Sequence, residues 1–115
     1  MKKERKPRKR YLVFKLYTIG GSPDFETFRS FLDDYMRRFL GLSGLIDSRV
    51  KLIRYDQETR YGIIRIISTD IDTVLLAFTR IRNIKDTPAS FIPLRLTGNL
   101  SRALKYIKRY EKRIQ

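Results

Sequence analysis

Residues 49–67 read RVKLIRYDQETRYGIIRII, and this stretch decides the fold. Two apolar-rich runs, Arg49 to Tyr55 and Tyr61 to Ile67, flank the polar residues 56–60. Five polar residues between two such runs are a connection of hairpin length. The stretch therefore predicts two adjacent antiparallel strands in the middle of the chain.

A strand and a helix are predicted before this hairpin. The β-branched and aromatic run from Tyr11 to Tyr17 predicts a first strand. Ser22 is the predicted N-cap of the helix, Pro23 its first residue, and Gly41 ends it. The residues at helical spacing that predict its apolar stripe are Phe25, Phe28, Leu32, Tyr35, Met36 and Phe39.

A helix, a strand and a final helix are predicted after the hairpin. Thr69 and Asp70 open the second helix, whose apolar side holds Ile71, Val74, Leu75, Phe78 and Ile81. Residues 90–97 predict a fourth strand, which Pro93 makes an edge strand or a bulged one. From Asn99 onward, a basic amphipathic helix is predicted by the apolar stripe of Leu100, Leu104, Ile107 and Ile114.

The element order is β-α-β-β-α-β with an added C-terminal helix. This is the α+β arrangement of ferredoxin-like and RNA-recognition-motif domains. A chain of 115 residues suits one core. We therefore expect a single α+β domain over residues 11–115, preceded by a flexible basic arm over residues 1–10, which has almost no apolar side chain to bury.

Positive charge is concentrated at the two ends of the chain. The sequence has 26 Lys and Arg against 12 Asp and Glu, a net charge of +14. Residues 2–10 contain seven basic residues and one acid, and residues 102–113 contain six and one. Two such segments predict a polyanionic partner.

The candidate RNA-binding residues come from the arm, the central hairpin and the last helix. Arg54 and Arg65 belong to the hairpin, where each is equally well explained by pairing with Asp56 or Glu58. The other candidates are Lys2, Lys3, Arg5, Lys6, Arg8, Lys9 and Arg10 in the arm, and Arg102, Lys105, Lys108, Arg109 and Lys112 in the last helix.

Catalytic chemistry has little support in this composition. The chain has no His and no Cys, which excludes nucleophile–His pairs, thiol nucleophiles and His- or Cys-based zinc sites. Asp33 and Asp34 fit a solvated helix face. Asp70 and Asp72 fit helix-start acids better than a magnesium pair. We expect no catalytic residue, no metal site and no cofactor bound by the chain.

Two further features bear on binding and location. The glycines before Ser22 fit a plain turn better than a phosphate cradle, because the Walker lysine is missing. No apolar run is long enough to span a membrane, and the charged start lacks a secretory signal. We expect a cytoplasmic protein without a membrane partner.

The third strand departs from the RNA-recognition motif. That motif carries a basic residue, Gly and then alternating aromatics that stack on bases. Here Ile63 and Arg65 follow Gly62 in the aromatic positions, which predicts binding by charge and shape. An apolar sheet face is expected from Tyr11, Val13, Tyr17, Ile63 and Ile67, and it is either an open protein interface or covered by the last helix.

Several ordered motifs resemble one family. They are Arg10 to Leu16, Leu40-Gly41 with Gly44, Leu52 to Asp56, Gly62 to Arg65, and Thr97 to Leu100 with Arg102. In this order and spacing they resemble ribonuclease P protein component 2 over residues 9–109. Ser101, Lys51 and Pro93 depart from the family pattern, and Thr-Gly-Asn replaces its Ser-Gly-Thr.

The resemblance implies an accessory subunit of ribonuclease P, the ribonucleoprotein that removes the 5′ leader from precursor tRNA. It implies that the RNA performs the hydrolysis and holds magnesium, and that the subunit binds this RNA and protein component 3, and precursor tRNA indirectly. No activity is expected from the chain alone. A short chain without an acidic tail favours the archaeal type.

Other classes of function remain open from the sequence. A ribosomal or general structured-RNA-binding protein of the same topology has the same composition. A nuclease using Asp70 and Asp72 would cleave RNA by itself, and a heterodimer module would bind protein and not RNA.

Overall fold

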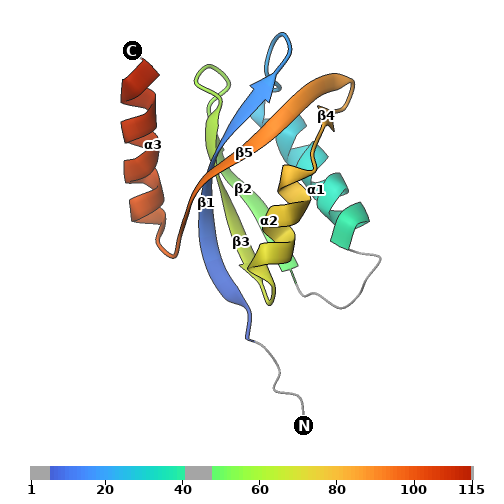
Figure 1. Ribbon diagram of the computed structural model, residues 1–115, viewed down its shortest axis with the longest axis vertical. Helices are drawn as coiled ribbons and strands as arrows, with labels where there is room; N and C mark the ends of the chain where they lie inside the picture. Colours follow the sequence, from blue (N-terminus) through green and yellow to red (C-terminus); the bar gives the residue numbers. More distant parts are fainter. Residues whose placement is uncertain (1–5, 41–47, 115) are drawn as a thin grey trace.

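The computed structural model describes residues 6–40 and 48–114 (Figure 1). The elements in chain order are β1 (Arg8–Thr18), α1 (Phe25–Leu40), β2 (Ser48–Tyr55), β3 (Tyr61–Ser68), α2 (Ile71–Thr79), β4 (Asn83–Ile84), β5 (Thr87–Thr97) and α3 (Leu100–Ile114). Every predicted helix and strand is present, and the short β4 is additional. The fold is the predicted ferredoxin-like α+β arrangement with a C-terminal helix.

The sheet has the strand order β2-β3-β1-β5-β4 with antiparallel neighbours. Side chains alternate between its two faces. Leu12, Phe14 and Ile64 pack with α1 and α2, whereas Val13 and Ile63 pack with α3. Figure 1 shows α1 and α2 on one side of the sheet and α3 alone on the other.

The larger core, on the α1 and α2 side, is aromatic. The Phe14 ring stacks on Phe91 at a centroid distance of 4.6 Å and meets Phe28 edge-on at 5.6 Å. Phe28, Leu32 and Met36 of the predicted α1 stripe are buried. Phe39, the last residue of that stripe, keeps 38% of its surface exposed. The helical periodicity therefore identified the packed side of α1 and overextended it by one residue.

The first strand begins earlier than predicted. Arg8, Lys9 and Arg10 belong to β1 and pair with Ser68, Ile67 and Ile66 of β3. The arm prediction is wrong for these three residues, because strand pairing uses the backbone and leaves charged side chains free to reach solvent. Residues 1–5 and the predicted turn at Gly41 and Gly44 lie outside the described residues.

The start of α1 also differs from the prediction. Asp24 caps this helix, since its Oδ1 accepts a hydrogen bond of 2.8 Å from the backbone N–H of Thr27. This hydrogen bond lowers the pKa of the Asp24 carboxyl. Ser22 is not the N-cap, because its hydroxyl donates to the Gln57 carbonyl at 2.7 Å. A contact 35 residues away in sequence takes the side chain that a local pattern assigned to the helix.

The bulge predicted at Pro93 is present. Val13 of β1 faces Arg95 of β5, and Phe14 faces Pro93, so Leu94 is an extra residue on β5. Leu94 packs with the cluster under α3. The bulge brings Arg95, which pairs with Val13, to the same side of the sheet as Leu94.

Gly62 of β3 provides a stability test. A Cβ added there would lie 2.5 Å from Phe14 Cζ and 2.6 Å from the Arg54 carbonyl oxygen. We expect Gly62→Ala to lower the free energy of unfolding by about 3 kcal/mol, measured by urea denaturation, because neither the core ring nor the backbone can give way cheaply. Gly21→Ala is the control. Nothing lies within 4 Å of that position, and equal stability of the two variants would contradict the close approach.

Candidate nucleic-acid interface

The last helix is docked on the sheet by Leu100, Leu104 and Ile107 of the predicted stripe and by Ala103, which the stripe did not include; the side chain of Ile114 lies outside the described residues. Ala103 and Ile107 are fully buried against Val13 and Ile63, and Leu100 and Leu104 pack beside them. The Tyr110 ring stacks on Tyr61 at 5.5 Å. Of the two alternatives for the apolar sheet face, α3 therefore covers this part, and Ile63 cannot contact a base. Tyr17, beyond the helix, remains 50% exposed.

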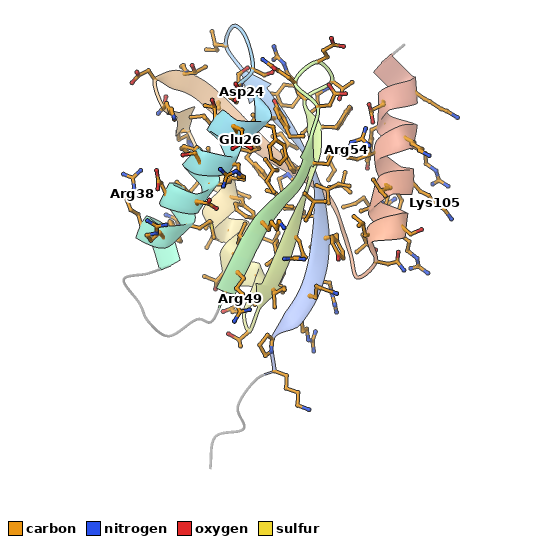
Figure 2. All side chains as sticks on the ribbon, turned by 180° about the vertical axis from the view of Figure 1, so that it is seen from behind. Asp24, Glu26, Arg38, Arg49, Arg54 and Lys105 are labelled. Atoms are coloured by element: carbon orange, nitrogen blue, oxygen red, sulfur yellow. The ribbon has the colours of Figure 1, made fainter. Side chains whose placement is uncertain are left out.

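The outer face of α3 is cationic. Arg102, Lys105, Lys108, Arg109 and Lys112 are all exposed. Figure 2 shows Lys105 pointing away from the sheet. Within the described residues no salt bridge neutralises any of these five side chains. The prediction that the last helix presents basic residues on its free surface is confirmed, and their contact with RNA stays a prediction.

The single acid of α3 is turned inward. Glu111 accepts a hydrogen bond of 3.2 Å from the Arg54 guanidinium on β2. The hairpin pairing considered for Arg54 is therefore wrong, because Asp56 instead accepts the backbone N–H groups of Glu58 and Thr59 within the turn. The charge of Arg54 is partly neutralised, and this ion pair clamps α3 to the edge strand.

A second set of cations lies on the sheet itself. Arg65 alternates with the core residues Ile64 and Ile66, so it lies on the α3 side of β3. Lys9 lies on the same side, as residue 9 is two positions before Tyr11 and four before Val13. No ion pair with Asp56, Glu58 or another described acid holds Arg65.

The other arm residues point elsewhere. Arg8 and Arg10, with Lys6, line a cleft on the opposite side of the sheet, next to Asp70 and Asp72 at the start of α2. The predicted arm is thus split between two faces. Lys2, Lys3 and Arg5 lie outside the described residues.

Three exposed cations were missed by sequence reasoning. The Arg95 guanidinium of β5 lies 4.6 Å from the centre of the Tyr106 ring, and Arg109 lies 5.9 Å from the same ring. Arg49 and Lys51 are exposed on the edge strand β2. The signal for these two was their alternation with Val50 and Leu52, which places both basic side chains on the face away from the main core.

The acids considered for catalysis have structural roles. Asp70 caps α2 by accepting the backbone N–H and the hydroxyl of Thr73 at 3.1 and 2.8 Å. Asp72 lies in the first turn of that helix, as the sequence predicted. The described residues contain no group of three or more His, Cys, Asp and Glu side chains placed to hold a metal ion.

The turn before α1 is held by side chains from the hairpin. Arg60 donates to the carbonyl of Gly20 at 3.0 Å, and Gln57 donates to the carbonyl of Ser22 at 3.1 Å. Gly20 has a φ of +88°, which suits glycine. These contacts support the plain-turn interpretation over a phosphate cradle. Across the described residues, no helix is both long and apolar enough to cross a membrane.

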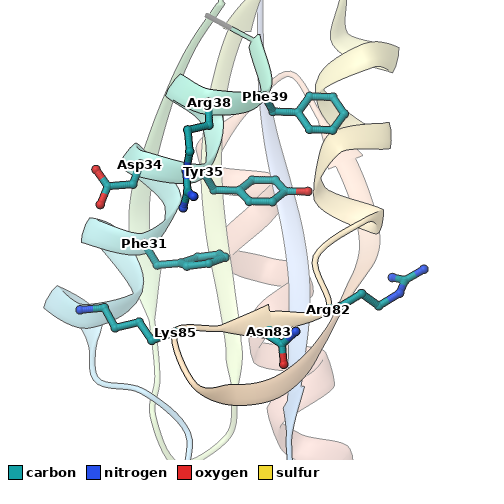
Figure 3. A pocket seen from close by; sticks show the side chains of 8 residues that line it. All are labelled: Phe31, Asp34, Tyr35, Arg38, Phe39, Arg82, Asn83 and Lys85. Carbon is teal, nitrogen blue, oxygen red and sulfur yellow. The ribbon is translucent and has the colours of Figure 1, made fainter.

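An aromatic pocket lies on the far side of the sheet from α3 (Figure 3). Along α1, Tyr35 stacks on Phe31 at 5.5 Å and on Phe39 at 5.9 Å. The Tyr35 hydroxyl donates to the Ala77 carbonyl of α2 at 2.7 Å, and burial raises the pKa of this phenol. Arg38, Arg82 and Lys85 border the pocket together with Asp34. This surface is chemically distinct from the cationic one.

Fold and surface together define a class of protein: a ferredoxin-like domain whose usual base-stacking face is covered by a helix that presents positive charge. Such a domain is suited to bind a polyanion through charge and shape. A family model described as the Rpp14/Pop5 family matches residues 10–108, and the chain belongs to this family.

The chain is also similar to a curated protein and to a chain in a solved structure. Ribonuclease P protein component 2 of Aeropyrum pernix is 26% identical over 105 residues, which cover 88% of this chain and 83% of that protein. A chain in the cryo-EM structure of yeast ribonuclease MRP superposes with a TM-score of 0.63 at 18% identity, covering 100% of this chain and 96% of the other. This second likeness concerns the fold.

A charge exchange tests the Arg54–Glu111 clamp. Arg54→Glu and Glu111→Arg should each lower the free energy of unfolding, because each places like charges side by side. The double variant should recover stability with a coupling energy of up to about 1 kcal/mol, since the pair is partly exposed. Thermal or urea unfolding of the four proteins gives this number. Strictly additive single effects would mean that the two side chains do not pair in solution.

Proposed function

We propose that this chain is an accessory protein subunit of ribonuclease P of the archaeal type. The observation that carries the proposal is the cationic outer face of α3, mounted on a domain of the Rpp14/Pop5 family. The similarity to a ribonuclease P protein component 2 supports it. In this role the chain binds and activates the catalytic RNA, which removes the 5′ leader from precursor tRNA.

The physical contribution of the protein is charge neutralisation. A compact catalytic RNA brings phosphates close together, and exposed Lys and Arg side chains lower their repulsion by displacing counterions. Magnesium ions are proposed to reside on the RNA. No side chain of this protein is assigned a step in phosphodiester hydrolysis.

The proposed partners follow from the family resemblance. They are the ribonuclease P RNA, ribonuclease P protein component 3 and, through the complex, precursor tRNA. A cytoplasmic location belongs to the same proposal. The alternative is a general structured-RNA-binding protein of the same topology, which would bind RNA without stimulating tRNA processing.

A processing assay at low magnesium tests the proposal. The catalytic RNA alone, the RNA with this protein and component 3, and the proteins alone are compared for cleavage of precursor tRNA. We expect cleavage only when RNA and proteins are combined, because added cations replace part of the magnesium that compaction requires. Cleavage by this protein alone would identify a nuclease. Binding without stimulation would favour the general RNA-binding alternative.

The cationic face of α3 has its own test. Lys105→Gln with Lys108→Gln removes two exposed charges and leaves Ala103 and Ile107 in place. We expect the dissociation constant for the catalytic RNA, measured by filter binding in ~0.15 M salt, to rise about tenfold, since each lost phosphate contact weakens binding severalfold. An unchanged constant with an unchanged melting temperature would remove α3 from the interface.

A further inference from the structure

The sheet face under α3 is only partly covered. Thr97, where β5 ends, pairs with Tyr11, and α3 begins at Leu100 and runs toward Tyr61. The sheet beyond Tyr11, toward the start of β1, therefore lies past the first turn of the helix, and Figure 1 shows the strands extending below α3. This leaves an open sheet patch at the foot of the helix.

The strand register places the side chains of this patch in two rows. One row runs from Lys9 through Ile67 to Arg49, and the next from Tyr11 through Arg65 to Lys51. Neighbouring strands lie about 5 Å apart, and the two rows about 7 Å. The open sheet patch thus gathers four cations, Lys9, Arg49, Lys51 and Arg65, around Tyr11 and Ile67.

No acid balances this group of cations. The rows contain no Asp or Glu, and the described salt bridges of the chain involve Arg29 and Arg54 only. Like charges facing each other across neighbouring strands, as Lys51 and Arg65 do, destabilise a sheet. This repulsion is not offset by any acid of the patch. Such an arrangement is expected where a bound anion supplies the missing negative charge.

We infer that the open sheet patch binds the phosphodiester backbone of RNA as a second contact, separate from the outer face of α3. The inference rests on the proposed function and deepens it by naming a site. Arg49 and Lys51 on the edge strand are its new residues, and Arg65 and Lys9 complete it. Arg102 lies in the first turn of α3, at the end of the helix that is nearest to the patch.

Backbone contact fits this patch better than base stacking. Tyr11 is half-buried against the cluster under α3, and the other central side chain is the aliphatic Ile67. Stacking on successive bases needs exposed aromatic rings, whereas the long Lys and Arg side chains around this centre can reach phosphates. The patch is expected to bind without sequence preference.

The test removes the two edge-strand charges with Arg49→Gln and Lys51→Gln. Both side chains are exposed, and removing their charge relieves the repulsion between Lys51 and Arg65, so the double variant should melt at or above the wild-type temperature. The probes are a fluorescein-labelled oligouridylate, a labelled RNA hairpin and the catalytic RNA. By fluorescence anisotropy we expect about tenfold weaker binding in ~0.15 M salt, and a plot of log K against log salt that is shallower by roughly 1.5. The probe that loses more affinity identifies single-stranded or duplex RNA as the ligand.

The matched control removes equal charge from the opposite side of the sheet, with Arg37→Gln and Arg80→Gln on α1 and after α2. It should bind as the wild type does.

Three outcomes would contradict the inference. If the edge-strand variant keeps full affinity and salt slope while Lys105→Gln with Lys108→Gln loses affinity, this inference fails and the proposed function stands. If the wild type binds none of the RNAs, both fail. Tighter binding of labelled polyglutamate than of RNA, lost in the edge-strand variant, would overturn the inference in favour of an acidic protein.

Discussion

The packing of α3 across one end of the sheet is the interaction on which the rest of the surface depends. Ala103 and Ile107 are buried on Val13 and Ile63, and each large aliphatic side chain buried in this way contributes about 1.5–3 kcal/mol. The contact removes the base-stacking face from solvent and fixes which side of the helix faces outward. Glu111 lies on the side of α3 that faces the sheet and pairs with Arg54, whereas the Lys and Arg residues of the candidate site on this helix face solvent.

The same contact explains why positive charge is divided between two places. A sheet has two faces, and α1 and α2 occupy one of them with the aromatic core. On the other face, α3 covers the rows near Val13 and Tyr61 and begins beside the end of β5. Residues beyond that point face water, so Lys9, Arg49, Lys51 and Arg65 are compatible with stability there, whereas the buried rows hold Ile63 and Val13.

Sequence reasoning succeeded where the signal is local. The hairpin at residues 49–67, the apolar stripes of the three helices and the bulge at Pro93 are periodic or steric features of short segments. It failed where a distant residue decides. Ser22 bonds to Gln57, which moves the helix cap to Asp24, and Arg54 meets an acid 57 residues away. The pairing of residues 8–10 with β3 was also missed. Their charged side chains are typical of a flexible arm, and strand pairing through backbone hydrogen bonds cannot be recognised from composition. The α3 half of the candidate site was predictable, but Arg49 and Lys51 can be assigned to an open surface only once the position where α3 begins on the sheet is known.

Unbalanced charge couples the stability of this domain to its partner. Five exposed cations on α3 and four on the open sheet patch repel one another in the free protein. The described salt bridges do not neutralise them, because they join Glu26 and Asp33 to Arg29 within α1, and Glu111 to Arg54. A polyanion that binds the folded state supplies the missing charge and stabilises that state in proportion to its affinity and concentration. The covered sheet face, by contrast, is held by apolar contacts that need no ligand. Apolar residues therefore hold the fold together, and a separate set of exposed cations binds the polyanion. Because the two sets are separate, the surface can carry a high positive charge without weakening the core that positions it.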